Sequence, residues 1–452
     1  MLDILTSIQC LCPYLQATTV GQLSRIIGAM LAMSGRVTMV GIARWAGPGG
    51  SYRTVQRFFY TVIAWPVLFW MFFRQHVLEP TDTYVLAGDE CVVTKAGKKT
   101  YGLDRFFSSL YGKPVPGLSF FTLSLISLKE RRSYPLRVEQ MLRTAAEKTA
   151  TQSKARKRIP QPQHTASKGR PGRPQGSKNR EKTHIVLSPE LQRIQTMIQQ
   201  QLSVINGIIP LSYTVLDGHF GNHLALHMVR GVGLQLISKL RHDAALYFPY
   251  DGPYAGRGPR RKYGSKLDYM HIPVKYLKRT TVEGNIQTNI YQATMWNKEF
   301  VTPLNVVIML KINLKTQARA HVVLFSSDTA LSDDQLIDYY SLRFQIEFNF
   351  RDAKQYWGLE DFMNVQPTAV TNAASLALFM VNVAHLLLQP FRKYHSQFGI
   401  LDLKAYCRGH KYVAETLKLL PQKPEPIVIA QMFDHLAKLG SVHNAEPTLN
   451  MS

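Results

Sequence analysis

The segment LSDDQLIDYYSLRFQIEFNFRDAKQYWG, residues 331–358, decides how the remainder of the chain is interpreted. It opens with Ser332-x-x-Gln335, a capping box typical of a helix N-terminus. At about 100° per residue, Arg343, Glu347 and Lys354 fall within about 60° of Tyr340 on a helical projection. We call these four residues the charged stripe. An adjacent apolar face consists of Leu342, Ile346, Phe350, Ala353 and Trp357. The segment therefore predicts one long helix that packs against a core.

The charged stripe has two explanations. On a solvated face, an i,i+4 pair of Arg343 and Glu347 would contribute only tenths of a kcal/mol. Alternatively, Glu347 acts together with other acids at a site. Two aspartates favour the site. Asp89 interrupts the apolar segment YVLAGDECVV, residues 84–93, where an unpartnered carboxylate is costly, and Asp217 ends the apolar segment PLSYTVLD.

Two strand aspartates and one helix glutamate can converge to hold two divalent ions. Two metals about 4 Å apart activate water or a 3′-hydroxyl and stabilise the leaving oxygen in phosphodiester chemistry. Mg²⁺, or Mn²⁺ in its place, suits such a site because it accepts a few carboxylates and leaves positions open for phosphate oxygens. The cationic members of the charged stripe would then bind phosphates beside the cleaved one. Asp89, Asp217 and Glu347 are therefore the candidate catalytic and metal-binding residues.

Composition supports a polyanionic partner. The 452 residues include 54 Lys and Arg against 30 Asp and Glu, a formal net charge of +24. Because 45% of the residues are hydrophobic, the chain can bury cores and is not a wholly disordered basic tail. The length predicts two to four domains. The small number of cysteines, four, excludes a disulfide framework, and the absence of a CxxC pair argues against a structural zinc site.

Most of the excess positive charge lies in two stretches. Residues 152–184 contain ten Lys or Arg and one acid, with Pro, Gly, Ser and Gln and almost no large apolar residue, so we expect a disordered arm. Residues 257–279 contain eight Lys or Arg and one acid, interleaved with tyrosines. In this second stretch the candidate DNA contacts are Arg260, Arg261 and Lys262.

The N-terminal part, up to residue 78, is predicted to be helical. Residues 37–59 have the form of a helix, a Pro-Gly-Gly turn and a second helix with Ser51 as its N-cap. This spacing fits a helix-turn-helix that presents Arg53 and Arg57 to DNA, and it fits an ordinary helical hairpin with a solvated basic face equally well.

The remaining elements follow from local patterns. We expect strands at residues 84–93 and 116–128, a mostly polar helix from there to about residue 150, and a helix over residues 188–208. Residues 240–327 should be β-rich. The apolar stretches 58–73 and 369–388 are interpreted as buried helices and not as membrane spans. With no basic-then-apolar signal at the N-terminus, we expect a cytoplasmic protein.

The charged stripe and the segments around Asp89 and residue 217 resemble those of a known family. Y-x2-R-x3-E-x6-K is the signature of bacterial DDE transposases of the insertion-sequence-four superfamily, and Tyr340, Arg343, Glu347 and Lys354 have its spacing. GDECVV around Asp89 and VLDGHFGN around residue 217 look like the first and second aspartate blocks of that family. The resemblance covers residues from about 50 to 390.

The resemblance implies an α/β fold: an RNase H-like catalytic core with a β-rich insertion, preceded by a helical DNA-binding domain. It implies that Asp89, Asp217 and Glu347 bind two Mg²⁺ or Mn²⁺ ions, and that Tyr340, Arg343 and Lys354 contact the transposon end. Arg351, beside the charged stripe, is a further candidate. The expected domains are 1–78 (helical), 79–240 (first part of the core), 241–327 (insertion), 328–395 (second part of the core) and 396–452 (helical).

The basic arm departs from the family pattern. Its KGRPGRPQGSK resembles an AT-hook, in which Arg170 and Arg173 would enter a narrow minor groove. The alternative is nonspecific attraction to phosphates.

The sequence therefore predicts a DNA transposase that acts on transposon ends and target DNA as a homodimer or larger assembly, with no membrane partner. Two alternatives stay open. One is an RNase H-like DNA endonuclease without strand transfer, and the other is a non-catalytic DNA-binding protein.

Overall fold

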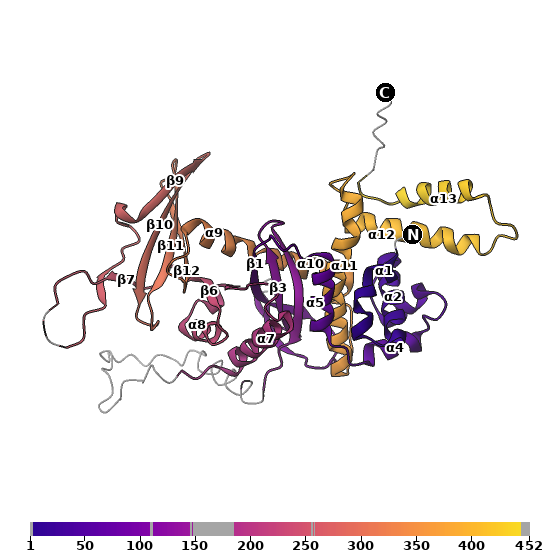
Figure 1. Cartoon of the computed structure of the whole chain (residues 1–452), viewed down its shortest axis with the longest axis horizontal. Coiled ribbons are helices and arrows are strands. Elements are labelled where there is room, and N and C mark those ends of the chain that lie inside the picture. The colour runs from indigo at the N-terminus through magenta and orange to yellow at the C-terminus, as the bar shows by residue number, and fades with distance from the viewer. Residues whose placement is uncertain are drawn as a thin grey trace, which may run out of the picture.

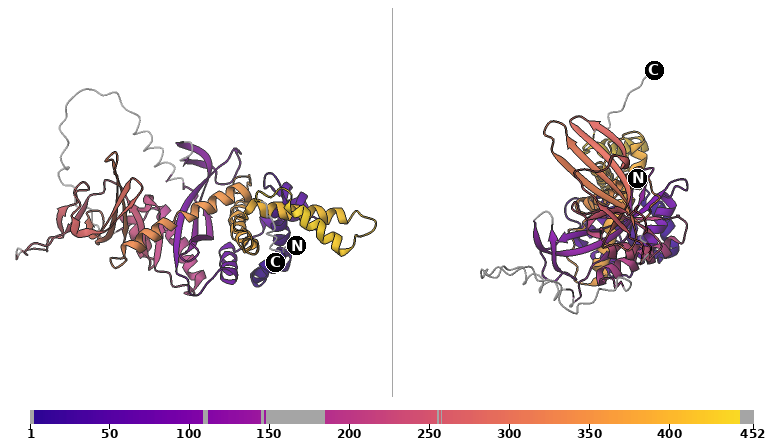
Figure 2. Two further views of the ribbon diagram at one scale, coloured as in Figure 1. Left: turned by 90° about the horizontal axis from the view of Figure 1, so that it is seen from above. Right: turned by 90° about the vertical axis from the view of Figure 1, so that its left-hand side faces the viewer.

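The computed structural model describes residues 3–108, 112–144, 147, 185–254, 256 and 258–443. The molecule is elongated (Figure 1), with a β-rich end formed by residues 246–326, a central sheet, and a helical end that combines residues 4–76 with residues 400–438. The view from above in Figure 2 shows the same three regions in a row. The expected AT-hook-like arm, with Arg170 and Arg173, lies outside the described residues.

The central sheet has five strands in the order β4-β3-β1-β5-β6. β3 runs antiparallel to both β1 and β4, whereas β1, β5 and β6 are parallel to one another. This order and these directions are consistent with an RNase H-like core. A short edge strand, β2, also pairs with β3. The bounds are β1 Tyr84–Thr94, β2 Asp104–Ser108, β3 Lys113–Ser127, β4 Arg132–Gln140, β5 Tyr213–Leu216 and β6 Gln235–Leu240.

The predicted polar helix between residue 128 and about residue 150 is wrong, because β4 occupies residues 132–140. Local polarity misled the prediction: Ser133 to Leu136 are all buried once β4 pairs with β3. Pro135 cannot donate a ladder hydrogen bond, and it lies where the register between β3 and β4 shifts. Proline is tolerated at such bulges and not in a helix interior, so Pro135 was the residue in the sequence that indicated a strand and not a helix.

The β-rich region continues the central sheet. β12 pairs antiparallel with β6, matching Val323 to Leu240, so the insertion and the core share one sheet. This strand pairing explains the position of the β-rich end in Figure 1. The bounds are β7 Leu246–Pro249, β8 Tyr263–Lys266, β9 Leu277–Glu283, β10 Ile286–Asn297, β11 Leu304–Asn313 and β12 Arg319–Ser326.

The helices expected before residue 78 are present, and they share one hydrophobic core with the rest of the chain. Asn372, buried in α11 (Pro367–Arg392), accepts a hydrogen bond from Trp65 Nε1 at 2.7 Å and donates to the carbonyls of Phe59 and Thr61 at 2.8 Å. The N-terminal bounds are α1 Ile4–Ile8, η1 Gln9–Tyr14, α2 Ala17–Ala32, α3 Met39–Ala46, α4 Tyr52–Tyr60 and α5 Trp65–His76.

α11 is long and apolar enough to cross a membrane, but 83% of its most apolar window is buried inside the protein. α4 and α5 pass the same test only as a pair bent by 98°. In Figure 1, α11 stands between the central sheet and helices α1, α2 and α4, and α5 lies on the sheet side of α11. Helices α5, α10 (Gln345–Trp357) and α11 all pack on β4. The apolar stretch is therefore a core helix in this fold.

The remaining helices connect and flank these parts. Ser188 caps the helix predicted over residues 188–208, and its side chain accepts a hydrogen bond from Leu191 N. Ser332 likewise accepts a hydrogen bond from Gln335 N at the start of α9. The bounds are α7 Pro189–Ile205, η2 Gly218–Phe220, α8 His223–Arg230, η3 Val274–Tyr276, α9 Asp333–Leu342, α12 Ile400–Leu417 and α13 Pro426–Lys438.

Candidate active site

Asp89 and Asp217 occupy equivalent positions on neighbouring parallel strands. The last registered pair between β1 and β5 is Gly88 with Leu216, and the two aspartates are the next residues of the two segments. At Asp217 the chain leaves the sheet: its Oδ1 accepts a hydrogen bond from His219 N at 3.1 Å and so caps η2. Ser238 Oγ, on β6, donates to the Asp217 carbonyl at 2.7 Å. Backbone pairing alone therefore brings two distant aspartates side by side.

Arg343 joins the first acid to the third. Its Nη1 donates to Asp89 Oδ2 at 2.7 Å, and its Nη2 donates to Glu347 Oε1 at 3.0 Å. The side chains of Arg343 and Asp89 are only 14% and 16% exposed, whereas that of Glu347 is 42% exposed. One guanidinium therefore neutralises two carboxylates on different elements, and the site opens to solvent on the Glu347 side.

The predicted single long helix is two helices with a break at Arg343 and Phe344. Across the break the backbone makes i→i+3 hydrogen bonds: Arg343 N donates to Tyr340 O at 3.2 Å, and Glu347 N donates to Phe344 O at 3.0 Å. These bonds give a tighter turn than the α-helix. Arg343 and Glu347 still face each other, and Tyr340 lies close enough for the Arg343 charge to oppose the rise of its pKa.

The electrostatics show that the three acids act on one another. Burial raises the pKa of Asp89 to about 6; the Arg343 charge opposes this, and the charges of Asp217 and Glu347 add to it. Burial also raises the pKa of Tyr340, which interacts with Arg343 and with both aspartates. Repulsion among nearby carboxylates is expected where a cation is to be bound.

Lys354, on α10, lies beside β1, three residues beyond Asp89 along that strand. Its Nζ donates to Val92 O at 3.0 Å and lies 3.5 Å from Glu360 Oε1. It also lies close to Cys91, whose pKa is raised to about 11 by burial while the Lys354 charge acts in the opposite direction. The structure therefore places Lys354 beside the strand that carries Asp89, with no ion pair to the three acids.

The two-metal site stays a prediction. In the part of the chain that the structure describes, no three His, Cys, Asp or Glu side chains form a group that could hold a metal ion. Arg343 lies between Asp89 and Glu347 and occupies one oxygen of each. The donor set nevertheless suits Mg²⁺ or Mn²⁺, because it consists of carboxylates that repel one another and of oxygens that these ions prefer.

The structure separates Arg351 from the other candidates. Its guanidinium bonds Asp352 Oδ1 at 3.0 Å and lies over the Phe348 ring, 4.8 Å from the centroid. Arg53 and Arg57 are exposed on α4, after a Ser51 N-cap that accepts a hydrogen bond from Thr54 N.

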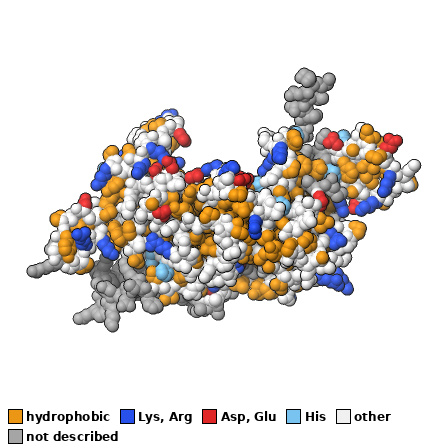
Figure 3. Space-filling view, in the orientation of Figure 1, with side chains coloured by type: hydrophobic (Ala, Val, Ile, Leu, Met, Phe, Trp, Pro, Cys, Tyr) orange, Lys and Arg blue, Asp and Glu red, His pale blue; other side chains and the backbone are white. Residues whose placement is uncertain are grey.

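The basic residues of the insertion form a third group, in the connection between β7 and β8. Each lies over an aromatic ring: Arg260 over Tyr254, Arg261 over Tyr250 and Lys262 over Trp296. Sequence analysis missed these aromatic partners, although the alternation of Tyr, Arg and Lys in residues 247–263 was a signal for them. Figure 3 shows Lys and Arg side chains at the β-rich end as well as over the centre of the molecule.

Comparison with known proteins adds one match. A family model described as DDE superfamily endonuclease matches residues 10–301. The matched range includes Asp89 and Asp217 and ends before Glu347, so the third acid rests on the geometry around Arg343. None of the curated proteins matches the chain.

Proposed function

Because the chain belongs to the DDE superfamily endonucleases, we propose that it is a DNA transposase of the insertion-sequence-four type. It would bind the terminal repeats of an insertion sequence, cleave the ends and join the 3′-hydroxyls to target DNA. One observation carries the proposal: Asp89, within β1, and Asp217, at the end of β5, directly follow the last registered pair of these two parallel strands, and the Arg343 guanidinium bonds both Asp89 and Glu347. The sequence signature of the charged stripe gives the more specific assignment.

Each residue of this cluster has a role in the proposal. Asp89, Asp217 and Glu347 would hold divalent cations, Mg²⁺ or Mn²⁺, which when bound activate the attacking oxygen and stabilise the leaving one. Arg343 neutralises two of the three carboxylates, and its planar guanidinium can exchange a carboxylate for a phosphate of similar geometry. Tyr340 is half-buried and lies close to Arg343. Lys354 lies beside β1. Tyr340 and Lys354 therefore border the place where DNA would lie.

Double-stranded DNA would bind at the solvent-exposed side of this cluster. Glu347 is the most exposed of the bridged groups, and the formal net charge of +24 favours a polyanion. Two transposon ends must be processed together, which implies a homodimer or larger assembly on DNA. The same substrate implies a cytoplasmic location at the nucleoid.

The test is a reaction of labelled linear DNA that carries the native element ends with a supercoiled target and Mg²⁺. The wild type is compared with Glu347→Gln and with Glu90→Gln. Glu90 is a matched control because it follows Asp89 but accepts a hydrogen bond from Ser119 Oγ, outside the acid cluster. We expect joined products with the wild type and the control, and none with Glu347→Gln. Cleavage without joining would replace the proposal by an endonuclease without strand transfer, and DNA binding alone by a non-catalytic DNA-binding protein.

A further inference from the structure

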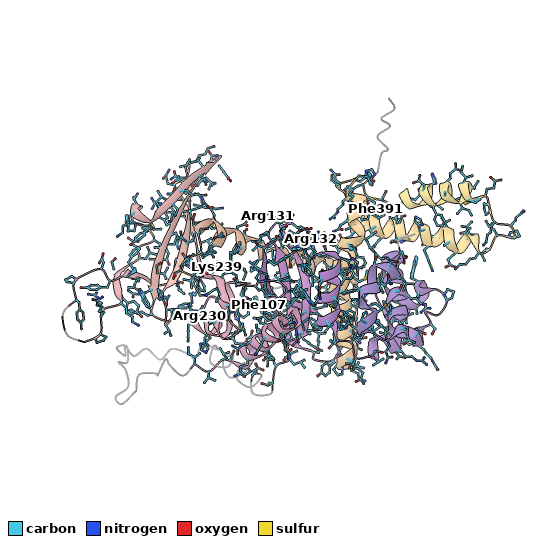
Figure 4. All side chains as sticks on the ribbon, in the orientation of Figure 1. Phe107, Arg131, Arg132, Arg230, Lys239 and Phe391 are labelled. Atoms are coloured by element: carbon cyan, nitrogen blue, oxygen red, sulfur yellow. The ribbon has the colours of Figure 1, made fainter. Side chains whose placement is uncertain are left out.

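A cavity of about 430 Å³ opens on the side of α10 that faces away from Glu347. Three arginines from different elements line it: Arg132 at the start of β4, Arg351 in α10 and Arg392 at the end of α11. We call it the arginine pocket. Figure 4 shows Arg131 and Arg132 at the upper edge of the central sheet, with Arg132 on the side toward α11.

The arginine pocket has more positive charge than the protein neutralises. Asp352 is the only carboxylate among its lining residues, and it pairs with Arg351 at 3.0 Å. Among the described residues, Arg132 and Arg392 form no ion pair, and Arg392 Nε donates only to the Phe398 carbonyl, at 2.9 Å. Burial lowers the pKa of Arg132; the charge of Arg392 acts in the same direction, and Tyr134, Asp352 and Glu130 oppose it. Two arginines that repel each other in a partly desolvated pocket favour an anion between them.

An exposed aromatic surface connects this pocket with the acid cluster. Relative to Glu347, Phe348 lies about 100° and Asp352 about 140° round α10. Phe348 and Phe344 remain 36% and 49% exposed, with ring centroids 5.3 Å apart. The Arg351 guanidinium extends this surface over the Phe348 ring. Exposed aromatic rings with an adjacent cation are the usual platform for nucleotides of a DNA strand.

The distances fit a short piece of strand. A helix with its side chains is about 10–12 Å across, and a DNA strand carries one phosphate per about 3.4 Å of helix axis. A strand would therefore cross α10 within about three or four nucleotides.

We propose that the arginine pocket binds a phosphate of the DNA strand that leaves the active site across α10, with Phe344 and Phe348 contacting the nucleotides between. This inference rests on the proposed function for the identity of the strand. The chemistry that the pocket recognises is a phosphate, and either a phosphodiester or a free phosphate ion could supply it. The continuity of the exposed aromatic surface favours the phosphodiester.

The test measures binding of a fluorescein-labelled 40-base-pair duplex across a series of NaCl concentrations. All proteins carry Glu347→Gln, so the result does not depend on cleavage. The pocket variant is Arg132→Gln with Arg392→Gln. The matched control is Arg131→Gln with Arg241→Gln, which also removes two charges. Arg131 is 55% exposed and pairs with Asp338 at 2.8 Å, and Arg241 is 82% exposed and pairs with Asp243 at 3.2 Å, both outside the pocket.

We expect the slope of log K against log salt to become less steep by about 1 in the pocket variant, with a roughly tenfold weaker Kd at low salt, and to change little in the control. Equal slopes for pocket variant and control would overturn the proposal. If the double variant does not fold, Arg132→Lys takes its place, because lysine keeps the charge and loses the bidentate contact; a Kd equal to that of the control would then overturn it.

A second measurement separates the two phosphate sources. The melting temperature is recorded in sodium phosphate and in sodium chloride at equal ionic strength. Stabilisation by phosphate that the pocket variant loses, together with an unchanged DNA slope, would assign a free phosphate ion and overturn the DNA contact. Failure of the joining reaction with an intact slope effect would overturn the proposed function and leave the pocket as a phosphate site.

Discussion

At the scale of single residues, the site depends on Arg343. Its two ion pairs connect β1 with α10, and both it and Asp89 are largely buried. A charge that loses its partner in such a place costs far more free energy than a surface pair contributes. Arg343 is therefore predicted to stabilise the fold when no cation is bound, in addition to any role on DNA.

The first prediction concerns this stabilisation. Arg343→Gln should lower the free energy of unfolding by about 1–3 kcal/mol, because the buried Asp89 carboxyl then either holds a charge without a partner or takes up a proton at a cost in free energy. Adding Asp89→Asn should recover most of the loss, since the unpaired charge is then removed. Urea denaturation of the two single variants and the double variant measures the coupling. Additive effects would show that Arg343 does not act through Asp89.

The second prediction separates catalysis from binding. Asp89→Asn, Asp217→Asn and Glu347→Gln should each reduce cleavage of element ends by roughly a thousandfold or more, because each removes one carboxylate of a group that acts as a unit. End binding should stay nearly unchanged, since no cationic contact is lost. Cleavage and gel-shift assays on the same protein preparations measure both. A variant that retains full cleavage would remove that residue from the catalytic group.

At the scale of elements, polar contacts join β4 to α11 and to α10, the helix that carries Glu347. His385 in α11 contacts Tyr134 in β4 at 3.0 Å, and Tyr134 also donates to Glu130. Asn382 donates to the carbonyl of Pro135 at 2.9 Å, next to the bulge in β4. Asn349, on α10, donates to Ser133 at 2.9 Å. The Asn349 link fixes α10, and with it Glu347, against β4, and the other two links fix α11 against the same strand.

The third prediction is a pH effect at this junction. Burial lowers the pKa of His385 to about 3, and the charges of Arg132 and Arg392 act in the same direction. The unfolded chain therefore binds a proton below about pH 6.5 that the folded chain excludes. Stability should fall as the pH falls from 6.5 towards 4, with His385 contributing up to about 1.4 kcal/mol per pH unit.

Urea denaturation at several pH values checks this effect. His385→Gln should flatten the decline of stability between pH 6.5 and 4, and His435→Gln, at an exposed position on α13, should not. The same decline in both variants would show that His385 is not the titrating group.

At the scale of the whole molecule, one sheet joins the β-rich end to the core, and one hydrophobic core joins the N-terminal helices to it. Basic residues occur on all three regions: Arg53 and Arg57 on α4, Arg132 and Arg392 beside α10, and Arg260 to Lys262 at the β-rich end. A DNA duplex bound along the molecule could therefore contact several regions at once.

The fourth prediction concerns the basic arm. Deleting residues 152–184 removes ten Lys and Arg and one acid, so DNA affinity should fall and the salt dependence should become less steep. The core should stay folded, because Glu147, before the arm, pairs with Arg193 on α7, after it, at 3.0 Å, and a short connection can replace the arm. Fluorescence anisotropy and thermal melting measure the two effects. An unchanged affinity would contradict the assigned role of the arm.

The sequence by itself determined much of the local structure and the identity of the candidate residues. The capping residues Ser51 and Ser332 marked helix starts, because a side-chain acceptor at that position satisfies free backbone N–H groups. Asp89 in an apolar strand marked a site, because a buried carboxylate is costly without a partner. The spacing of the charged stripe marked the third acid.

Only the tertiary structure decided how these residues meet. The register of β1 with β5 places Asp217 beside Asp89, and Arg343 bridges Asp89 and Glu347 across two elements. The same long-range pairing made residues 132–140 a strand against their local polarity, and brought Arg132 next to Arg392. Patterns within a short segment carry no information on which distant segment will pair with it, because that choice depends on the free energy of the whole packed core.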